Sequence, residues 1–363
     1  MIRPLLTALL GLALCLAGGT FDTASLYVPG VALLLLAVGL VAWVRLAASG
    51  ATVERLPGPH TVVEEDPYPL RVEVRSGALP PPGGELLEPL LGWPVPIGGR
   101  WSRRLRINVR FARRGRRILE PELLVIRDPL QLHTREVRGE NRDEVLVLPR
   151  VYPVRATAGG GDATPAHARA ALIAAAETEL DGLREHRPGS PASRIHWPAV
   201  ARGHGLMERK LISEADSRPL VVLDPRAPAS QDALDNAVRA AASLTVHFAR
   251  RSGCSLLLPG DRRAHVVERD LVAWPAAHVR LALLDEATGP SLVAAQNRRG
   301  LVVLVAARVV DRPPRGLGRT PGGCVLVIPG ALPNRRAVFE VAGCQGFLAT
   351  RTGAAAAMEA VAG

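Results

Sequence analysis

Two apolar runs stand at the start of the chain, Leu5–Ala17 and Leu26–Val44. The second is long enough to span a bilayer as a helix, whereas the shorter first run also fits a secretory signal peptide. Arg3 precedes the first run, Arg45 follows the second, and Asp22 is the only charge between the runs. The positive-inside rule therefore predicts two transmembrane helices within residues 1–48 of a plasma-membrane protein, with both chain ends in the cytoplasm.

Residues 52–150 have a different pattern, in which apolar and polar positions alternate. Leu70–Arg75 and Leu105–Phe111 are typical of half-buried strands, and Pro80–Gly84 supplies a turn. This predicts a β-sandwich-like antiparallel domain of roughly seven short strands. The basic stretch Arg113–Arg117 is interpreted as a solvated hairpin tip between two of them.

The last part of the chain, residues 216–363, alternates buried-strand runs with helical stretches. Leu220–Asp224, Leu301–Val305 and Cys324–Ile328 are strands by composition, and Ser230–Arg250 is an amphipathic helix. This order predicts an α/β domain with a doubly wound, mostly parallel sheet.

Residues 151–215 connect the two predicted domains. Gly159–Asp162 reads as a flexible linker, because no Gly-Lys-Ser/Thr sequence follows to make it a phosphate loop. The alanine-rich stretch His167–Glu179 is expected to form a short helix.

Composition narrows the class of partner. The net charge is +11 and aromatic residues make up only 4% of the chain, so no basic cluster has the interleaved aromatics of a nucleic-acid surface. We therefore expect the lipid bilayer, and not nucleic acid, to account for the positive charge. The four cysteines, Cys15, Cys254, Cys324 and Cys344, form no CxxC pair. Cys15 lies in the first apolar run, and the other three are expected to be reduced core residues of a cytoplasmic domain.

The densest local pattern lies between residues 179 and 209. In order, it contains Gly182, Arg184, Pro188, Gly189, Arg194, Ile195, Trp197, Ala201 and Arg202. This pattern resembles the signature of the domain of unknown function 58 family, with Gly-x-x-Arg-x-Tyr-x-Pro-Gly-Asp followed by Arg-x-Ile-x-Trp and Ala-Arg. The chain departs from it at His186 and Ser190, where the family commonly has tyrosine and aspartate. It also has one residue fewer than this pattern between Gly182 and Arg184 and between Arg194 and Ile195.

The resemblance extends to the N-terminal helices and the β-rich segment, and thus to nearly the whole chain. It implies a von Willebrand factor A-like fold for the C-terminal domain and a MoxR-type AAA+ ATPase as partner. Such domains often bind a divalent cation through Asp-x-Ser-x-Ser. Here the sequence is Asp224-Pro225-Arg226-Ala227-Pro228. We predict no metal at this degenerate position, and expect Asp224 to pair with Arg226 or to cap the next helix.

The arginines of the signature are the candidate partner-binding residues. Guanidinium groups and an aromatic ring suit contacts with a phosphate, a carboxylate or an acidic surface, and the set comprises Arg184, Arg187, Arg194, His196, Trp197 and Arg202. In the alternative interpretation, the arginines pair within the chain with Glu179, Asp181, Glu208 and Glu214.

Two classes of function remain open. The first is a non-catalytic, membrane-anchored scaffold or adaptor that needs no cofactor. The second is a membrane-associated hydrolase using His186, His196 and Asp181, but no serine, cysteine or paired carboxylate is placed to act with them. The adaptor is therefore preferred.

Overall fold

The protein divides into two compact units. Unit 1 comprises Met1–Ala112 and Arg116–Val147, and unit 2 comprises Arg113–Gly115 and Leu148–Gly363. The structure, a computed structural model, describes residues 2–98, 102–140, 142–157, 183–185, 197–203, 205–209, 218–285, 289–290, 293–296, 298, 300–315, 317, 323–333 and 335–349. The expected linker at Gly159–Asp162 and the expected helix at His167–Glu179 lie outside these residues.

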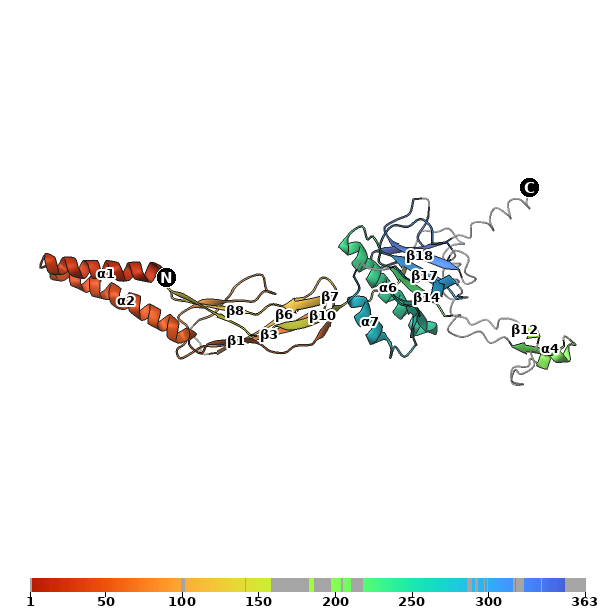
Figure 1. Cartoon of the computed structure of the whole chain (residues 1–363), viewed down its shortest axis with the longest axis horizontal. Coiled ribbons are helices and arrows are strands. Elements are labelled where there is room, and N and C mark those ends of the chain that lie inside the picture. Colours follow the sequence, from red (N-terminus) through yellow and green to blue (C-terminus); the bar gives the residue numbers. More distant parts are fainter. Residues whose placement is uncertain are drawn as a thin grey trace. The chain divides into compact units, whose positions relative to one another are not determined.

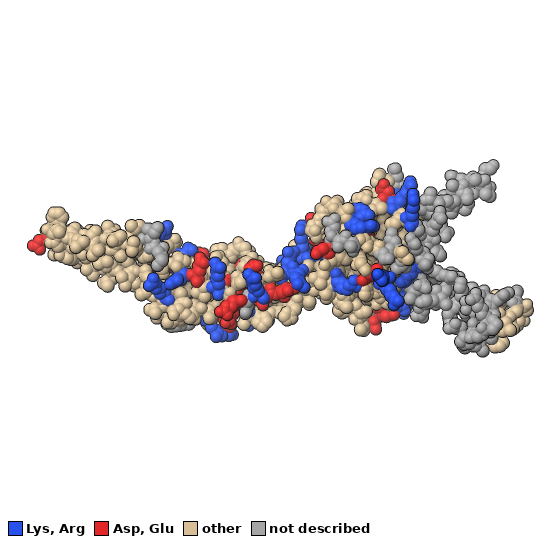
Figure 2. All heavy atoms as spheres, viewed as in Figure 1, with Lys and Arg blue, Asp and Glu red and all other residues tan. Residues whose placement is uncertain are grey.

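Unit 1 begins with a helical hairpin. Helices α1 (Ile2–Thr20) and α2 (Ala24–Ala48) lie side by side (Figure 1), and both are long and apolar enough to cross a membrane. In Figure 2, charged side chains are sparse along most of the hairpin. A Cβ on Gly11 would come within 2.8 Å of the Gly30 carbonyl oxygen, so these glycines allow close helix packing. The predicted pair of apolar helices is thus confirmed, while its orientation stays a prediction.

The last turn of α2 belongs to the core of unit 1. Val44 and Ala47 are fully buried in one cluster with strand residues of the β-rich part. The carbonyl oxygen of Ala47 accepts a hydrogen bond of 2.9 Å from the backbone N–H of Gly77. The apolar run therefore serves two purposes, since its end packs against the β-rich part and only the preceding turns are available to a bilayer.

The β-rich part of unit 1 contains three small sheets, with strand orders β1-β3-β6, β2-β10-β7 and β5-β4-β8-β9. The two predicted strands are the longest pair, with Leu70 opposite Ile107 in an antiparallel register. The strands are β1 (Thr52–Arg55), β2 (Thr61–Val63), β3 (Pro67–Arg75), β4 (Gly84–Leu87), β5 (Val95–Pro96), β6 (Ser102–Arg110), β7 (Gly115–Leu119), β8 (Leu123–Arg127), β9 (Thr134–Arg138) and β10 (Asp143–Leu148). The estimate of roughly seven strands was too low, because strands of two or three residues are too short to have a recognisable alternation.

A charged cluster is buried inside unit 1. The Arg55 side chain is 1% exposed; its Nη2 lies 2.8 Å from Glu88 Oε1 and its Nε lies 3.0 Å from Glu122 Oε1. Both glutamates are also buried, and Asp143 lies 3.6 Å from Arg55 Nη1 at the edge of the cluster. Burial raises the pKa of Glu88 and of Glu122, and the opposing effect of Arg55 does not cancel it. Arg55 is thus the cation that makes two buried carboxylates tolerable.

Unit 2 is built on one eight-stranded sheet, with strand order β11-β19-β20-β18-β17-β14-β15-β16. The four neighbouring strands β18, β17, β14 and β15 are parallel, and the strands outside them pair antiparallel. The strands are β11 (Arg155–Ala156), β14 (Leu220–Asp224), β15 (Cys254–Leu257), β16 (His265–Val267), β17 (Val302–Ala306), β18 (Cys324–Pro329), β19 (Phe339–Val341) and β20 (Cys344–Leu348). The sheet is therefore mixed, which corrects the expectation of a mostly parallel one.

Helices α6 (Gln231–Ser252) and α7 (Trp274–Ala282) accompany this sheet (Figure 1). Leu234, Val238 and Phe248 of α6 pack in one buried cluster with β14 and β17. The other face is covered by loops and by the four-residue helix α8 (Val293–Gln296). Between β17 and β18, the described residues 307–315, 317 and 323 contain no α-helix. The expected helical layer on both faces is thus only partly present.

Three of the cysteines are core residues, as predicted. Cys254, Cys324 and Cys344 are buried and free, and burial raises the pKa of each thiol to about 12. They act as small apolar side chains.

Arg113–Gly115, which lie in the chain between β6 and β7, belong to unit 2. The Arg114 side chain is 3% exposed, and its Nε lies 3.1 Å from Asp235 Oδ1 of α6. Its Nη1 faces the carbonyl oxygens of Leu281, Ala282 and Leu284 at the end of α7, at 2.8 to 3.3 Å. The prediction of a solvated tip was wrong for Arg114, because its cation balances a buried carboxylate and the negative end of a helix.

Close packing at β20 gives a first testable expectation. Gly346 lies opposite Phe339 in the antiparallel β19–β20 pair, and a Cβ at this position would overlap the buried Phe339 ring. We expect Gly346→Ala to destabilise unit 2 by about 1–3 kcal/mol, as overpacked cores do. Thermal unfolding of the detergent-solubilised chain would measure this loss. Gly98→Ala is the control, because neither glycine has a positive φ and a Cβ at Gly98 would make only an ordinary 3.7 Å contact. Equal losses in the two variants would contradict the overlap.

Candidate functional site

Asp224 is the last residue of β14, at the carboxyl edge of the parallel strands. Ligands of open α/β sheets commonly bind at this edge. The Asp224 side chain is buried, and Arg226 binds it in a bidentate way, with Nε 2.8 Å from Oδ1 and Nη2 2.9 Å from Oδ2. The predicted pairing of Asp224 with Arg226 is therefore present. The alternative role as a helix cap belongs to Ser230, whose Oγ accepts a 3.1 Å hydrogen bond from the Ala233 N–H.

A second arginine joins this pair from the neighbouring strand. Arg308 lies two residues beyond β17; its Nη2 is 3.2 Å from Asp224 Oδ2 and its Nη1 donates to the Arg226 carbonyl oxygen at 2.6 Å. Burial disfavours the charged form of Asp224, but the hydrogen bonds and charge of Arg226, with the charge of Arg308, outweigh it and lower the pKa of this carboxyl. The carboxylate is therefore ionised at neutral pH.

Two guanidinium groups around one carboxylate leave the carboxyl edge with an excess positive charge. The side chains of Arg226 and Arg308 remain 45% and 33% exposed. Nη1 of Arg226 has no hydrogen-bond partner among the described residues. A partly exposed guanidinium with unused donors suits a carboxylate or a phosphate. We call Asp224, Arg226 and Arg308 the edge cluster.

The backbone around the edge cluster leaves room for Arg226. A Cβ on Gly289 would lie 2.6 Å from Arg226 Nε, so a larger residue there would displace the guanidinium. The absence of a side chain at Gly289 therefore leaves the space that the Arg226 guanidinium occupies.

The signature segment is described only in part. Strand β12 (Leu183–Glu185) pairs antiparallel with β13 (Met207–Arg209), which places the Cα of Arg184 opposite that of Glu208. Helix α4 (Trp197–Ala201) lies against β13. Arg187, Arg194 and His196 lie outside the described residues.

Two of the candidate partner-binding residues are accessible. The Trp197 side chain is 62% exposed, and Arg202 is also exposed. No hydrogen bond or ion pair among the described residues joins either of them to the edge cluster. Their role in partner binding stays a prediction.

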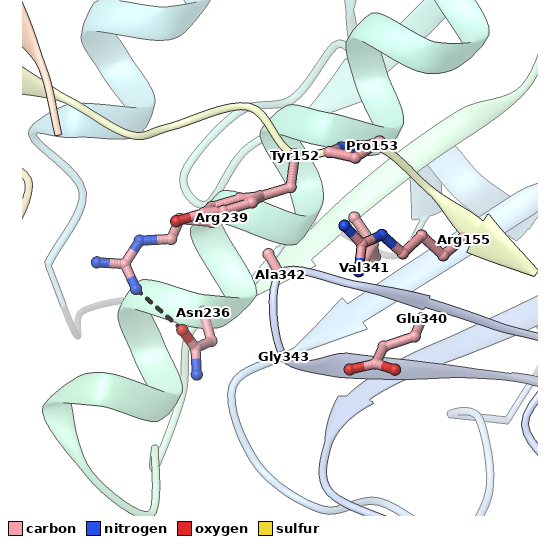
Figure 3. A pocket seen from close by; sticks show the side chains of 9 residues that line it. All are labelled: Tyr152, Pro153, Arg155, Asn236, Arg239, Glu340, Val341, Ala342 and Gly343. Carbon is pink, nitrogen blue, oxygen red and sulfur yellow. Dashed lines mark hydrogen bonds between the residues drawn. The ribbon is translucent and has the colours of Figure 1, made fainter. Parts of the chain in front are cut away.

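Unit 2 also contains a cavity of about 410 Å³ that the sequence did not indicate (Figure 3). It lies between α6, the segment that leads into β11, and the β19–β20 hairpin. Its lining residues are Tyr152, Pro153, Arg155, Asn236, Arg239, Glu340, Val341, Ala342 and Gly343. Arg308 was likewise missed, although its place just beyond a buried strand at the same sheet edge was a signal.

Comparisons with known proteins add little. No protein-family model matches the sequence, and no curated protein matches it. Among solved structures, the chain is similar to the CARDB domain of a Pyrococcus furiosus protein that was crystallised in complex with di-metal ions. The two sequences are 16% identical, the match covers 28% of this chain and 92% of that chain, and the TM-score is 0.20. Such a low TM-score carries no argument about fold or function.

Proposed function

We propose that this protein is a non-catalytic, membrane-anchored adaptor whose C-terminal α/β domain binds an acidic group of a protein partner at the edge cluster. The observation that carries the proposal is the pair of exposed guanidinium groups fixed on a buried carboxylate at the carboxyl edge of β14 and β17. The apolar hairpin supplies the anchor, with both chain ends in the cytoplasm.

The edge cluster favours binding because its charges are fixed before any partner arrives. Arg226 is oriented by Asp224 through two hydrogen bonds, and Arg308 is oriented by Asp224 and by the Arg226 carbonyl oxygen. Pre-oriented donors lose little side-chain freedom on binding, so an acidic group would gain bidentate contacts at low entropic cost. Complementary charge would also speed the encounter.

The partner that we propose is a MoxR-type AAA+ ATPase, in protein assembly or remodelling. This part rests on the resemblance of the signature segment to the domain of unknown function 58 family, as does the von Willebrand factor A-like character of the α/β domain. In that interpretation, Arg226 stands where related domains have a serine that helps to bind a cation. The positive charge of the edge would then come from arginine.

Charge reversal at Arg308 tests the proposal, and Arg308→Gln is made beside it because a glutamate at this position would face the buried Asp224 carboxylate. The bidentate pair of Asp224 with Arg226 does not involve Arg308, and thermal unfolding of each variant would show that the domain remains folded. Tagged full-length protein would be extracted gently from its native host, and the co-purifying proteins would be identified by mass spectrometry. We expect an AAA+ ATPase with the wild type and at least about tenfold less of it with Arg308→Glu, because a favourable ion pair becomes a repulsive one.

Arg269→Glu is the matched control. Arg269 is an exposed residue of the same unit, and this substitution changes the net charge by the same amount as Arg308→Glu. Trp197→Ala tests the signature segment separately. An ATPase that is recovered equally with Arg308→Glu and with wild type would exclude the edge cluster as its binding site. Recovery of no ATPase with wild type would reject the proposed partner.

A further inference from the structure

The cavity in unit 2 has the features of a preformed binding site for a small anionic molecule. Its volume of about 410 Å³ lies in the range of small-molecule pockets. The edge cluster contributes none of the residues that line it. A ligand here would therefore be a second functional feature, independent of the proposed adaptor role.

The walls of the cavity are fixed by hydrogen bonds. The backbone N–H of Tyr152 donates to Ser243 Oγ at 2.9 Å, and this hydroxyl in turn donates to the Arg239 carbonyl oxygen at 2.6 Å. Upstream, the buried His278 ring forms a 2.7 Å hydrogen bond with the Pro149 carbonyl oxygen. Downstream, Arg155 pairs opposite Glu340 in the β11–β19 register. The segment that closes the cavity is thus attached to α6, α7 and the sheet.

The polar groups in the cavity come from both walls. Asn236 and Arg239 are one turn apart on α6, and Arg239 Nη1 donates to Asn236 Oδ1 at 2.9 Å (Figure 3). Because that bond uses the amide oxygen, Asn236 presents its NH₂ group as a donor. Arg155 and Glu340 come from β11 and β19. Two guanidinium groups and one carboxylate therefore line the cavity.

The remaining lining is apolar or aromatic. The Tyr152 side chain lies along the α6 wall in Figure 3, and Pro153 and Val341 complete the lining on the strand side. The turn at its edge contains Ala342 with φ of +49° and Gly343 with φ of +74°. Both positive φ values are those of a two-residue type I′ hairpin turn, which joins β19 to β20 at the edge of the cavity. Asn236 Nδ2 would lie 3.2 Å from a Cβ on Gly343, so glycine keeps the amide close to this turn.

We propose that this cavity binds an organic phosphate attached to a flat ring, such as a nucleoside monophosphate. A phosphate monoester carries about −1.5 to −2 charges at pH 7 and three acceptor oxygens. It can therefore accept hydrogen bonds from both Arg155 and Arg239, whereas a ligand with a single carboxylate has oxygens for one bidentate contact. The ring would stack on Tyr152, and Glu340 would accept from an amine or hydroxyl of the ligand.

Binding to the full-length protein in detergent would test this by isothermal titration calorimetry. The probes are AMP, ribose 5-phosphate, adenosine and inorganic phosphate. We expect AMP to bind most tightly, since only AMP carries both the dianion and the ring. Arg155→Ala and Arg239→Gln should each weaken AMP at least about tenfold, which is the loss of one charge-assisted contact. Tyr152→Ala should weaken AMP but not ribose 5-phosphate.

Arg269→Ala, an exposed arginine outside the cavity, is the control and should leave AMP affinity unchanged. Arg155 is itself exposed, so its substitution does not endanger the fold. The proposal is overturned if AMP does not bind to the wild type, if adenosine binds as tightly as AMP, or if Arg155→Ala and Arg239→Gln behave like the control. None of these outcomes bears on recovery of the ATPase, so the two proposals fail separately.

Discussion

Arg55→Met is expected to destabilise unit 1 by about 3–5 kcal/mol at neutral pH, the cost of removing one member of a buried ionic cluster. The substitution keeps most of the side-chain volume but leaves Glu88 and Glu122 buried without the cation that lies 2.8 and 3.0 Å from them. Hydrogen exchange of the full-length protein, followed by mass spectrometry of peptides from β1, β4 and β8, would measure the opening free energy.

The pH dependence of this loss has a definite sign. The pKa values of Glu88 and Glu122 are raised in the folded protein above their ordinary value of 4.5. The folded state therefore binds protons more tightly than the unfolded state, so the stability from these carboxyls is full below about pH 4.5 and is lost as the pH rises through their folded pKa values. Removing Arg55 raises those values further. The variant should thus differ least from wild type near pH 5 and most near pH 8.

Arg75→Met is the control, because the Arg75 side chain is 65% exposed and its partner Glu73 keeps a second ion pair with Arg104. It should leave the opening free energy nearly unchanged, because solvent screens an ion pair with an exposed member. Adding Glu88→Gln and Glu122→Gln to Arg55→Met should restore part of the stability, since neutral amides need no cation. A loss that is independent of pH would contradict an electrostatic origin.

Arg114→Ala should lower the stability of α6 and α7 by about 3–5 kcal/mol. The Asp235 carboxylate loses the cation 3.1 Å away, and three carbonyl oxygens at the end of α7 lose a donor. The stability of Arg114→Lys should lie between that of wild type and that of Arg114→Ala, since lysine keeps the charge but cannot reproduce the planar guanidinium group. Hydrogen exchange of peptides from α6 and α7 in the full-length protein measures both losses.

The neighbouring residue provides a matched control. Arg113 pairs with Asp232 at 2.7 Å, but both side chains are exposed to solvent. Arg113→Ala should therefore cost only a few tenths of a kcal/mol. Similar protection changes in Arg113→Ala and Arg114→Ala would mean that burial of Arg114 has no energetic role.

Strands and single buried arginines differ in how well the sequence predicts them. Strands with clear alternation, such as β3 and β6, follow from local pattern, because each side chain's face is fixed by its parity. Arg114 stands among four other charged or glycine positions in Arg113–Arg117 with nothing local to set it apart. Its burial depends on Asp235 and on the end of α7, more than a hundred residues later.

In the edge cluster, too, one part was predictable from the sequence and the other was not. The Asp224–Arg226 pair was predictable because the two residues are two positions apart at the end of a buried strand. Arg308 is 82 positions beyond Arg226, and it joins the cluster only because β17 lies beside β14 in the sheet. The cavity in Figure 3 is lined by residues of α6, β11 and β19. It therefore depends on the order of the strands in the sheet, which no local sequence pattern encodes.

The membership of Arg113–Gly115 in unit 2 limits how this protein can be taken apart. The backbone passes from one unit to the other after Ala112, after Gly115 and after Val147. A fragment that begins at Leu148 would therefore keep Asp235 and lose Arg114. Moving the C-terminal unit into another protein would lose the Arg114 contacts unless the segment between β6 and β7 supplied them again. The C-terminal unit thus includes a residue that precedes β7 in the chain, although each unit has a core of its own.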